Sequence, residues 1–258
     1  MKQYKVLLKK EWKQFLMEWK IIWFPIVFIL LGLMQPVVTY YMPLLLETFG
    51  GSEGITIDPL VMKQTSGEVL ASTIGSQFDQ LGVMVIVISI MGMIQMDRKD
   101  GMLDIILTKP VSLISYVLSK YSSHLLLVLF SISVGYLISY GYTVFLFDPI
   151  PIQNVLLGFA YYSFWIAFIV ALVLLMSAVF KQTAILAISS IGILFMIHMM
   201  KGWNRILDLL LPSTISAEAM NQIITGQGSE IFIHIVVTVL WSIILIYLTV
   251  QKLSIRKE

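Results

Sequence analysis

Residues 149–180 read PIPIQNVLLGFAYYSFWIAFIVALVLLMSAVF and contain no Asp, Glu, Lys or Arg. A helix needs about 20 mostly apolar residues to cross the hydrocarbon core of a bilayer. This run is longer than that and is bounded by Asp148 and Lys181. The stretch therefore predicts a helix that spans a membrane.

The composition of the whole chain points the same way. Of its 258 residues, 58% are hydrophobic and 12% are charged, against about 25% charged in an ordinary soluble domain. Asp79 and Asp97 bound a shorter charge-free run and are expected to lie at its two water interfaces. We therefore expect an all-α membrane protein, a single transmembrane domain over 1–258. Its six spanning helices are predicted at about 21–44, 79–96, 121–147, 154–180, 182–200 and 231–251.

Lys and Arg are distributed unevenly between the predicted loops. Of the 17 in the chain, only Lys63, Lys201 and Arg205 fall on the side opposite the N-terminus. Because basic residues gather in short cytoplasmic loops, we expect a multi-pass protein of the cell membrane with both termini in the cytoplasm. The chain has no cysteine, which excludes disulfides and thiolate metal sites.

Residues 2–20 have the pattern of a helix that lies in the membrane surface. Its apolar face comprises Leu8, Trp12, Phe15, Leu16 and Trp19. Lysines, Lys9 and Lys13 among them, occupy much of the opposite side. Trp, Phe and Leu suit the acyl boundary while Lys suits anionic headgroups. We name this segment the elbow helix, with membrane contacts at Lys9, Trp12, Lys13, Phe15 and Trp19. Whether it only anchors the chain or also touches a cytosolic partner stays open.

Two patterns concern how the spanning helices pack. Ser131, Gly135 and Ser139 recur at four-residue spacing, which predicts a close helix–helix seam because small side chains let backbones approach in lipid. Tyr162 and Trp165 belong to an aromatic cluster over 161–165. Such a cluster favours an interfacial belt over a substrate contact.

The sequence offers little catalytic or ion-binding chemistry. Residues 50–54 match the hydrolase pattern G-x-S-x-G but follow no predicted strand, so we interpret the match as coincidence. The three histidines have no carboxylate at metal-ligand spacing. No charge lies deep in a predicted span, where ion-coupled carriers usually place one. The chain also has no G-x-x-x-x-G-K-[ST] phosphate loop, so energy for uphill transport must come from another polypeptide.

The cytoplasmic segment 97–120 is the most specific part of the chain. It reads DRKDGMLDIILTKPVS from residue 97 to residue 112. Gly101 can end the preceding helix, and Pro110 suits the first turn of the next one. Between them an apolar ridge on a short helix is expected to face the cytosol, formed by Leu103, Ile106 and Leu107. The alternative is a loop that merely lies on headgroups.

This segment resembles the coupling-helix region of type-2 ATP-binding-cassette (ABC) exporter permeases, whose pattern runs E-R-x-x-G-T-L-E-x-L-L-x-x-P-V-S. The direct matches include Gly101, Leu103, Leu107, Pro110, Val111 and Ser112. Asp97 and Asp104 stand where the family favours Glu, Ile106 replaces a Leu, and Met102 replaces the Thr. The order of basic amphipathic start, six spans and long first outer loop is also similar.

The resemblance implies a transport subunit without an enzyme site, which pairs with a second copy or a paralogue. It implies two copies of a separate cytosolic ABC ATPase, with ATP and Mg bound there and no cofactor on this chain. The implied ATPase-coupling residues are Asp97, Gly101, Leu103, Asp104, Ile106, Leu107 and Pro110. Helices 79–96 and 182–200 would line a central path, with candidate path residues Met84, Ser89, Met91, Ser189, Phe195 and Met196.

The expected function is therefore an ATP-driven exporter permease for a hydrophobic or amphipathic substrate such as a peptide, drug or lipid. Its expected partners are the ATPase, a second permease and membrane lipid, with no nucleic acid. Two alternatives stay open. A channel or ion-coupled carrier would support flux without an ATPase. An intramembrane enzyme would need the three histidines for its activity.

Overall fold

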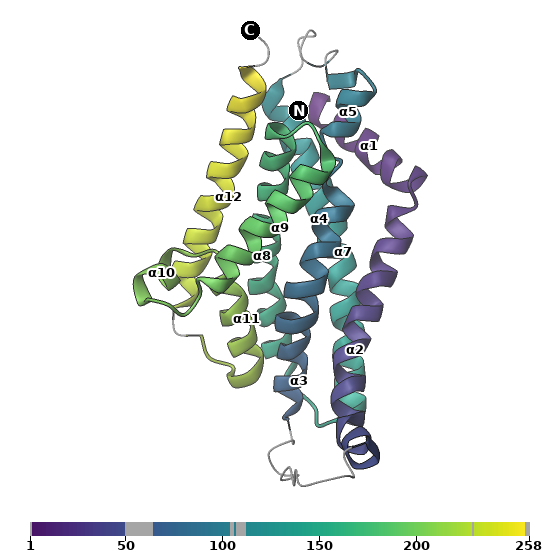
Figure 1. Ribbon diagram of the computed structural model, residues 1–258, viewed down its shortest axis with the longest axis vertical. Helices are drawn as coiled ribbons and strands as arrows, with labels where there is room; N and C mark the ends of the chain where they lie inside the picture. Colours follow the sequence, from purple (N-terminus) through teal and green to yellow (C-terminus); the bar gives the residue numbers. More distant parts are fainter. Residues whose placement is uncertain (1, 50–63, 104–105, 107–111, 229, 256–258) are drawn as a thin grey trace.

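The computed structural model describes residues 2–49, 64–103, 106, 112–228 and 230–255. Within these residues the chain is helical and contains no β-strand. The helices are α1 Lys2–Met17, α2 Lys20–Phe49, α3 Ser66–Ser72, the π-helix η1 Thr73–Gly82, α4 Val83–Ile90, α5 Gln95–Lys99, α7 Leu113–Leu146, α8 Ile152–Val179, α9 Thr183–Met199, α10 Arg205–Leu210, α11 Thr214–Thr225 and α12 Ile231–Ser254. Figure 1 shows an elongated bundle with both chain termini at the same end; we call this the terminal end and the opposite one the far end.

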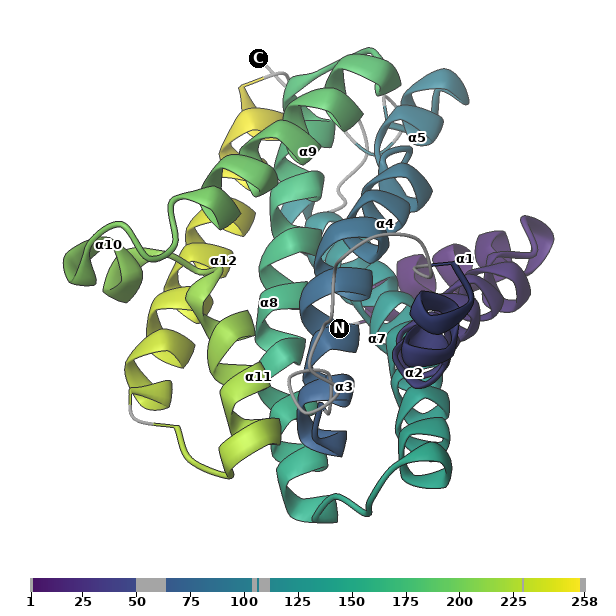
Figure 2. The same cartoon turned by 60° about the horizontal axis from the view of Figure 1, so that its bottom comes forward.

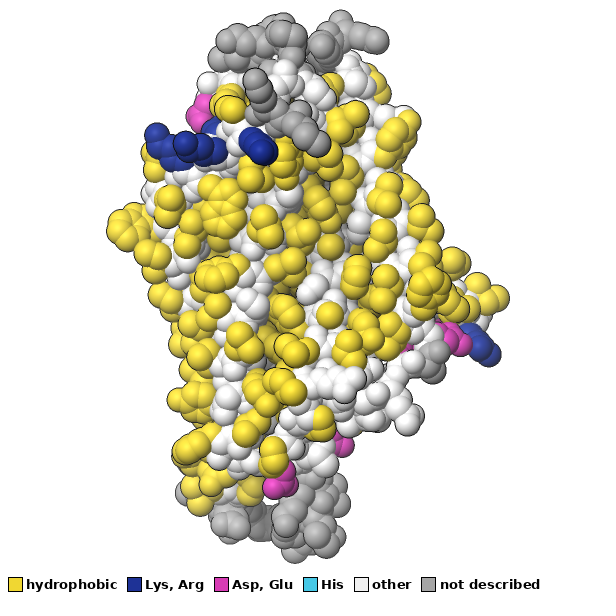
Figure 3. Space-filling model, turned by 180° about the vertical axis from the view of Figure 1, so that it is seen from behind, with side chains coloured by type: hydrophobic (Ala, Val, Ile, Leu, Met, Phe, Trp, Pro, Cys, Tyr) yellow, Lys and Arg dark blue, Asp and Glu magenta, His cyan; other side chains and the backbone are white. Residues whose placement is uncertain are grey.

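The prediction of an all-α membrane protein is confirmed. Among the described residues, five helical segments are long and apolar enough to cross a bilayer, namely Lys20–Leu44, Ser66–Lys99, Leu113–Leu146, Ile152–Val179 and Ile231–Ser254. The apolar helix α9 has 17 residues, which is at the short end of the range for a span. Hydrophobic side chains dominate the surface between the basic residues near the terminal end and the charged residues on α10 (Figure 3). Such a surface suits lipid rather than water.

The second spanning segment begins earlier than the charge-free run suggests. Its start at Ser66 is set by a capping box: the Thr65 hydroxyl accepts from the Glu68 amide, and the Glu68 carboxylate accepts from the Thr65 amide at 2.7 Å. From there α3, η1, α4 and α5 follow one another as far as Lys99; we call this the long rod. Part of the rod, η1, is a π-helix. Such helices are rare, and those that occur are frequently located at functional sites. Asp79 therefore lies inside the rod rather than at its end.

The elbow helix is present as α1, but not all of the residues predicted to contact the membrane are exposed. Phe15 is 1% exposed and packs edge-on against the His124 ring, with centroids 4.8 Å apart. Trp12 is half-buried beside Phe15, while Trp19, Lys9 and Lys13 are exposed. The prediction that Phe15 contacts the membrane is wrong, because this side of α1 packs on α7.

Helices α2 and α7 pack along much of their length, as Figures 1 and 2 both show. A methyl group on Gly135 would lie 2.4 Å from the Phe28 carbonyl oxygen, and one on Gly32 would lie 2.3 Å from the Gly135 carbonyl oxygen. The predicted seam is thus confirmed, since only glycine allows the two backbones to come this close. One turn further along α7, the Ser139 hydroxyl pairs with the hydroxyl of Thr73 in the long rod at 2.9 Å.

Candidate functional site

Buried charges meet where α1, α5 and α7 come together at the terminal end. The Lys120 amine lies 2.9 Å from a Glu11 carboxylate oxygen and 2.8 Å from Asp97 Oδ2. The Lys10 amine lies 2.5 Å from Asp97 Oδ1, and the Tyr116 hydroxyl donates to Asp97 Oδ2 at 2.8 Å. Lys120, Glu11 and Asp97 are all buried. We call Lys10, Glu11, Asp97 and Lys120 the ion-pair cluster.

The ion-pair cluster fixes the relative position of three helices. Its two cations and two carboxylates balance, so neither sign of charge is left over within it. Removing one partner of a buried ion pair typically costs about 3–5 kcal/mol, because the other charge is left buried without compensation. The pairs need not add net stability over an apolar core. The ion pairs do hold α1, α5 and α7 in fixed positions relative to one another.

A second set of contacts ties α5 to the end of α8. The Arg98 guanidinium donates to the carbonyls of Ala178 at 2.8 Å and Phe180 at 3.0 Å. The Gln95 amide donates to the carbonyls of Phe180 at 2.9 Å and Ser177 at 3.2 Å. Carbonyls in the last turn of a helix have no partner within the helix. Side chains of α5 therefore cap α8 and hold it against the start of the segment 97–120, which we call the coupling loop.

The coupling loop itself differs in part from the sequence prediction. Gly101 has a φ of +66°, a left-handed conformation that glycine adopts without strain. Leu103 is 2% exposed and Ile106 4% exposed, within the main hydrophobic core. The prediction that these two side chains face the cytosol as a free ridge is therefore wrong, because they pack on the body of the chain. Asp104, Leu107 and Pro110 lie outside the described residues.

Asp97 is also placed differently from its prediction. It was expected at a water interface, yet it is buried among Lys10, Lys120 and Tyr116. Burial of a carboxylate is tolerated here because two ammonium groups and a hydroxyl replace its water. Asp97 thus positions α5 from inside rather than presenting a charge to a partner.

The candidate path residues lie on α4, at the start of the turn that follows it, and on the neighbouring helix α9. Met84, Phe195 and Met196 are exposed, whereas Met91 and Ser189 are half-buried. Ser89 is nearly buried, and its hydroxyl donates to the Val85 carbonyl of its own helix at 2.6 Å. The exposed members present an apolar surface, and the Ser89 hydroxyl is already engaged.

A polar cluster around Asp79 was missed by sequence reasoning. Asp79 Oδ1 accepts from the Tyr162 hydroxyl at 3.0 Å and from Trp165 Nε1 at 3.1 Å, and Oδ2 accepts from the Ser216 hydroxyl. The three donors are buried, so the prediction of an interfacial belt is wrong for Tyr162 and Trp165. The spacing of Tyr162 and Trp165, which puts both on one face of α8, is the signal that could have paired them with an acid. The cluster joins the π-helix, α8 and α11.

Glu18 is a charged group at the joint between α1 and α2, outside the spanning segments. Partial burial raises the pKa of its carboxyl, but hydrogen bonds from Lys20 at 2.6 Å and Gln14 at 2.8 Å outweigh this and leave the pKa below its usual value. Glu18 therefore stays ionised near neutral pH. Its contribution to stability is present above its unfolded-state pKa and is lost as the pH falls through the lowered value.

Comparison with known proteins assigns the chain to a family. Residues 5–254 match the family model described as ABC-2 family transporter protein. The chain belongs to the ABC-2 transporter family. This ABC-2 chain is also 29% identical over 233 residues to the Uncharacterized transmembrane protein YxlG of Bacillus subtilis (strain 168), a span that covers 90% of this chain and 89% of the relative. The predicted resemblance to type-2 ABC permeases is thereby confirmed.

Family membership gives the coarse function of this ABC-2 chain. It is a multi-pass membrane permease of an ABC transporter, in which the ATPase belongs to a separate subunit. Association with an ABC ATPase follows from the family. The ion-pair cluster and the α5–α8 contacts lie beside the segment that resembles the coupling helix.

Proposed function

We propose that this ABC-2 permease is the membrane subunit of an ATP-driven exporter, and that its ATPase acts on the loop that follows Gly101. The distribution of Lys and Arg supports placing the terminal end, and with it this loop, in the cytoplasm. Two permease copies, or this chain and a paralogue, sit on two ATPase copies. ATP and Mg bind to the ATPase subunits.

The observation that carries the proposal is how the loop after Gly101 is attached to the rest of the chain. Its first flank, α5, is fastened to α1 and α7 through Asp97 and to α8 through Arg98. Packed helices respond to a displacement by shifting as rigid units rather than by bending. A push on the loop therefore moves α5 together with three of its neighbours, and the long rod carries the movement toward the far end.

The surface of α4 and α9 supports a hydrophobic or amphipathic cargo. Its exposed side chains include Met84, Phe195 and Met196. Neither helix carries an Asp, Glu, Lys or Arg. Flexible Met and flat aromatic rings adapt to apolar ligands of different shapes. The cargo leaves the cytoplasm along this surface, between the two permease copies.

Lys120→Met tests the role of the ion-pair cluster. The substitution leaves Glu11 and Asp97 with too little positive charge, and we expect the permease to lose about 3–5 kcal/mol of stability. The double variant Lys120→Met with Glu11→Gln removes one charge of each sign. It should regain thermal stability in detergent, but ATP-driven export in proteoliposomes should stay at least about tenfold below wild type because the α1–α7 link is gone, a loss equivalent to about 1.4 kcal/mol of coupling.

Lys252→Met is the matched control, because Lys252 is exposed near the end of α12 and makes no contact with the cluster. It should keep both stability and export. A double variant that folds and exports like wild type would show that the cluster takes no part in coupling. Flux that proceeds in the absence of the ATPase would overturn the proposed function as a whole.

A further inference from the structure

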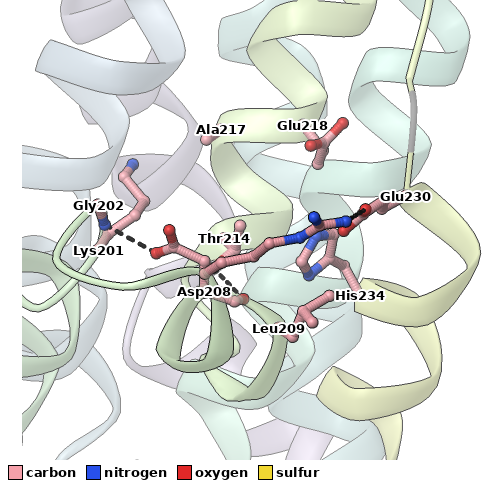
Figure 4. A pocket seen from close by; sticks show the side chains of 10 residues that line it. Lys201, Gly202, Asp208, Leu209, Thr214, Ala217, Glu218, Glu230 and His234 are labelled. Carbon is pink, nitrogen blue, oxygen red and sulfur yellow. Dashed lines mark hydrogen bonds and ion pairs between the residues drawn. The ribbon is translucent and has the colours of Figure 1, made fainter.

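A polar cavity of about 400 Å³ lies between α10, α11 and α12. Figure 4 shows its lining, which includes charged side chains of both signs. Ligand pockets in proteins have volumes of about 300–1,000 Å³. The charged and imidazole groups that line it are Lys201, Arg205, Asp208, Glu218, Glu230 and His234.

Three of these groups are already engaged within the chain. The Arg205 guanidinium contacts Glu230 at 3.0 Å. The Asp208 carboxylate accepts from the Gly202 amide at 2.7 Å. The Thr214 hydroxyl donates to the Asp208 carbonyl at 2.8 Å and holds α10 against α11. These contacts build the wall of the cavity.

The side chains of the other three are not bonded to any of the described lining residues, although the Lys201 charge also acts on the buried Asp79 carboxylate. Within the described part of the chain, neither the Lys201 amine nor the Glu218 carboxylate makes a hydrogen bond or an ion pair. His234 is 3% exposed, and its Nδ1 has no hydrogen-bond partner. Because that nitrogen is itself buried, the half-buried Lys201 and Glu218 are the two groups that a ligand can reach. In Figure 4, Lys201 lies on one side of the cavity beside Gly202, and Glu218 lies on the other.

The chemistry of these free groups defines the ligand. A cation on one side and a carboxylate on the other suit a molecule that carries both charges. The Glu218 carboxylate accepts hydrogen bonds, which a primary ammonium can donate. A metal ion fits less well, since no group of three carboxylate or histidine side chains among the described residues converges closely enough to hold one.

The surroundings of the cavity suit the headgroup level of a membrane. Helix α10 projects from the bundle in Figures 1 and 2, and Trp241 Nε1 donates to the Leu210 carbonyl at 3.1 Å, which fastens α10 to α12. Exposed apolar side chains lie within two residues of lining residues along the chain, namely Trp203, Ile206 and Phe232. Trp is enriched at the membrane–water interface, where its ring meets acyl chains and headgroups together.

We propose that this cavity binds a phosphoethanolamine zwitterion. Its phosphate lies against Lys201, and its ammonium donates to Glu218. The zwitterion comes either from the headgroup of a membrane phospholipid or from a soluble phosphoethanolamine compound. The assignment of the cavity to the outer membrane surface rests on the orientation in the proposed function, whereas the ligand chemistry does not.

The test is retention of lipid by the full-length permease in nanodiscs that contain equal amounts of phosphatidylethanolamine, phosphatidylcholine and phosphatidylglycerol, read by native mass spectrometry. Phosphatidylethanolamine should be retained over the other two by about tenfold, since charge-assisted hydrogen bonds of its ammonium are lost in both competitors. Glu218→Gln and Lys201→Met should each lower this retention by about tenfold. Asp148→Asn and Lys252→Met, at exposed positions away from the cavity, should leave it unchanged.

A soluble competitor separates the two sources. Glycerophosphoethanolamine in excess should displace the lipid if the cavity serves a free zwitterion and should fail to do so if acyl chains contribute to binding; both results support the proposed chemistry. Equal retention of the three lipids, or retention that neither cavity variant lowers, would overturn it. Because neither measurement involves ATP or the ATPase, failure here leaves the exporter proposal intact, and failed export would leave this one intact.

Discussion

At the scale of single residues, the buried polar groups of this chain are paired with partners from distant segments. Asp97 ends a charge-free run, so its place near the end of a span is predictable. Its partners are not, because Lys10 and Lys120 come from distant segments and sequence rules connect only neighbours a few positions apart. The same holds for Asp79, whose donors come from α8 and α11. By contrast, Gly135 was predictable, since small residues repeat around it at helical spacing.

Gly135→Ala and Gly141→Ala, both on α7, should shift stability in opposite directions. At Gly135 the new methyl group meets backbone atoms of α2 at 2.4 Å, and backbone cannot move aside as a flexible side chain can, so we expect a loss of about 1–3 kcal/mol. At Gly141 no atom lies within 4 Å, so the higher helix propensity of alanine should stabilise the protein by up to about 1 kcal/mol. Thermal unfolding in detergent measures both. If both variants unfold at a higher temperature than wild type, the backbones of α2 and α7 are not in close contact.

At the scale of helices, hydrophobic periodicity predicted where a helix forms better than it predicted what the helix packs against. The apolar pattern of residues 2–20 correctly indicates a helix. It does not reveal that Glu11 and Phe15, one turn apart, both face the protein, because a hydrophobic face packs equally well on lipid or on a neighbouring helix. The joint after α1 was not predictable either. There Trp19 has a φ of +57°, a conformation that is unusual for a bulky residue.

The same ambiguity applies to the coupling loop, and two substitutions resolve it. Leu103 is buried, so Leu103→Asp should lower the unfolding temperature of the isolated permease, because an unpaired carboxylate is costly in a core. Asp100 is exposed on the same loop, so Asp100→Lys should leave the unfolding temperature unchanged and reduce the amount of ATPase that co-purifies. The opposite pattern, a stable Leu103→Asp permease that has lost its ATPase, would mean that the ridge faces the ATPase after all.

At the scale of the whole molecule, the long rod connects the two ends of the bundle. Its α5 end belongs to the ion-pair cluster, and its π-helix carries Asp79, which contacts α8 and α11. In the proposed mechanism, a shift of the coupling loop is therefore passed along the rod through polar contacts at its α5 end and at Asp79 inside its π-helix. Between those contacts, the side chains of α4 make no hydrogen bond to α8 or α9 among the described residues, and α4 keeps an exposed side. This is the stretch where a rigid shift can open or close a surface without breaking a polar contact.

The exposed side of α4 and α9 should accordingly lie between the two permease copies, and disulfide cross-linking can show it. Because the chain has no cysteine, each introduced thiol reports on its own position. Met84→Cys and Phe195→Cys should yield covalent dimers on oxidation, in amounts that change when ATP hydrolysis is trapped. Leu137→Cys is the control, since Leu137 is equally exposed and apolar but lies on α7. Dimers that form through Leu137→Cys and not through the other two would place the contact between copies on α7, and the path between α4 and α9 would have to be abandoned.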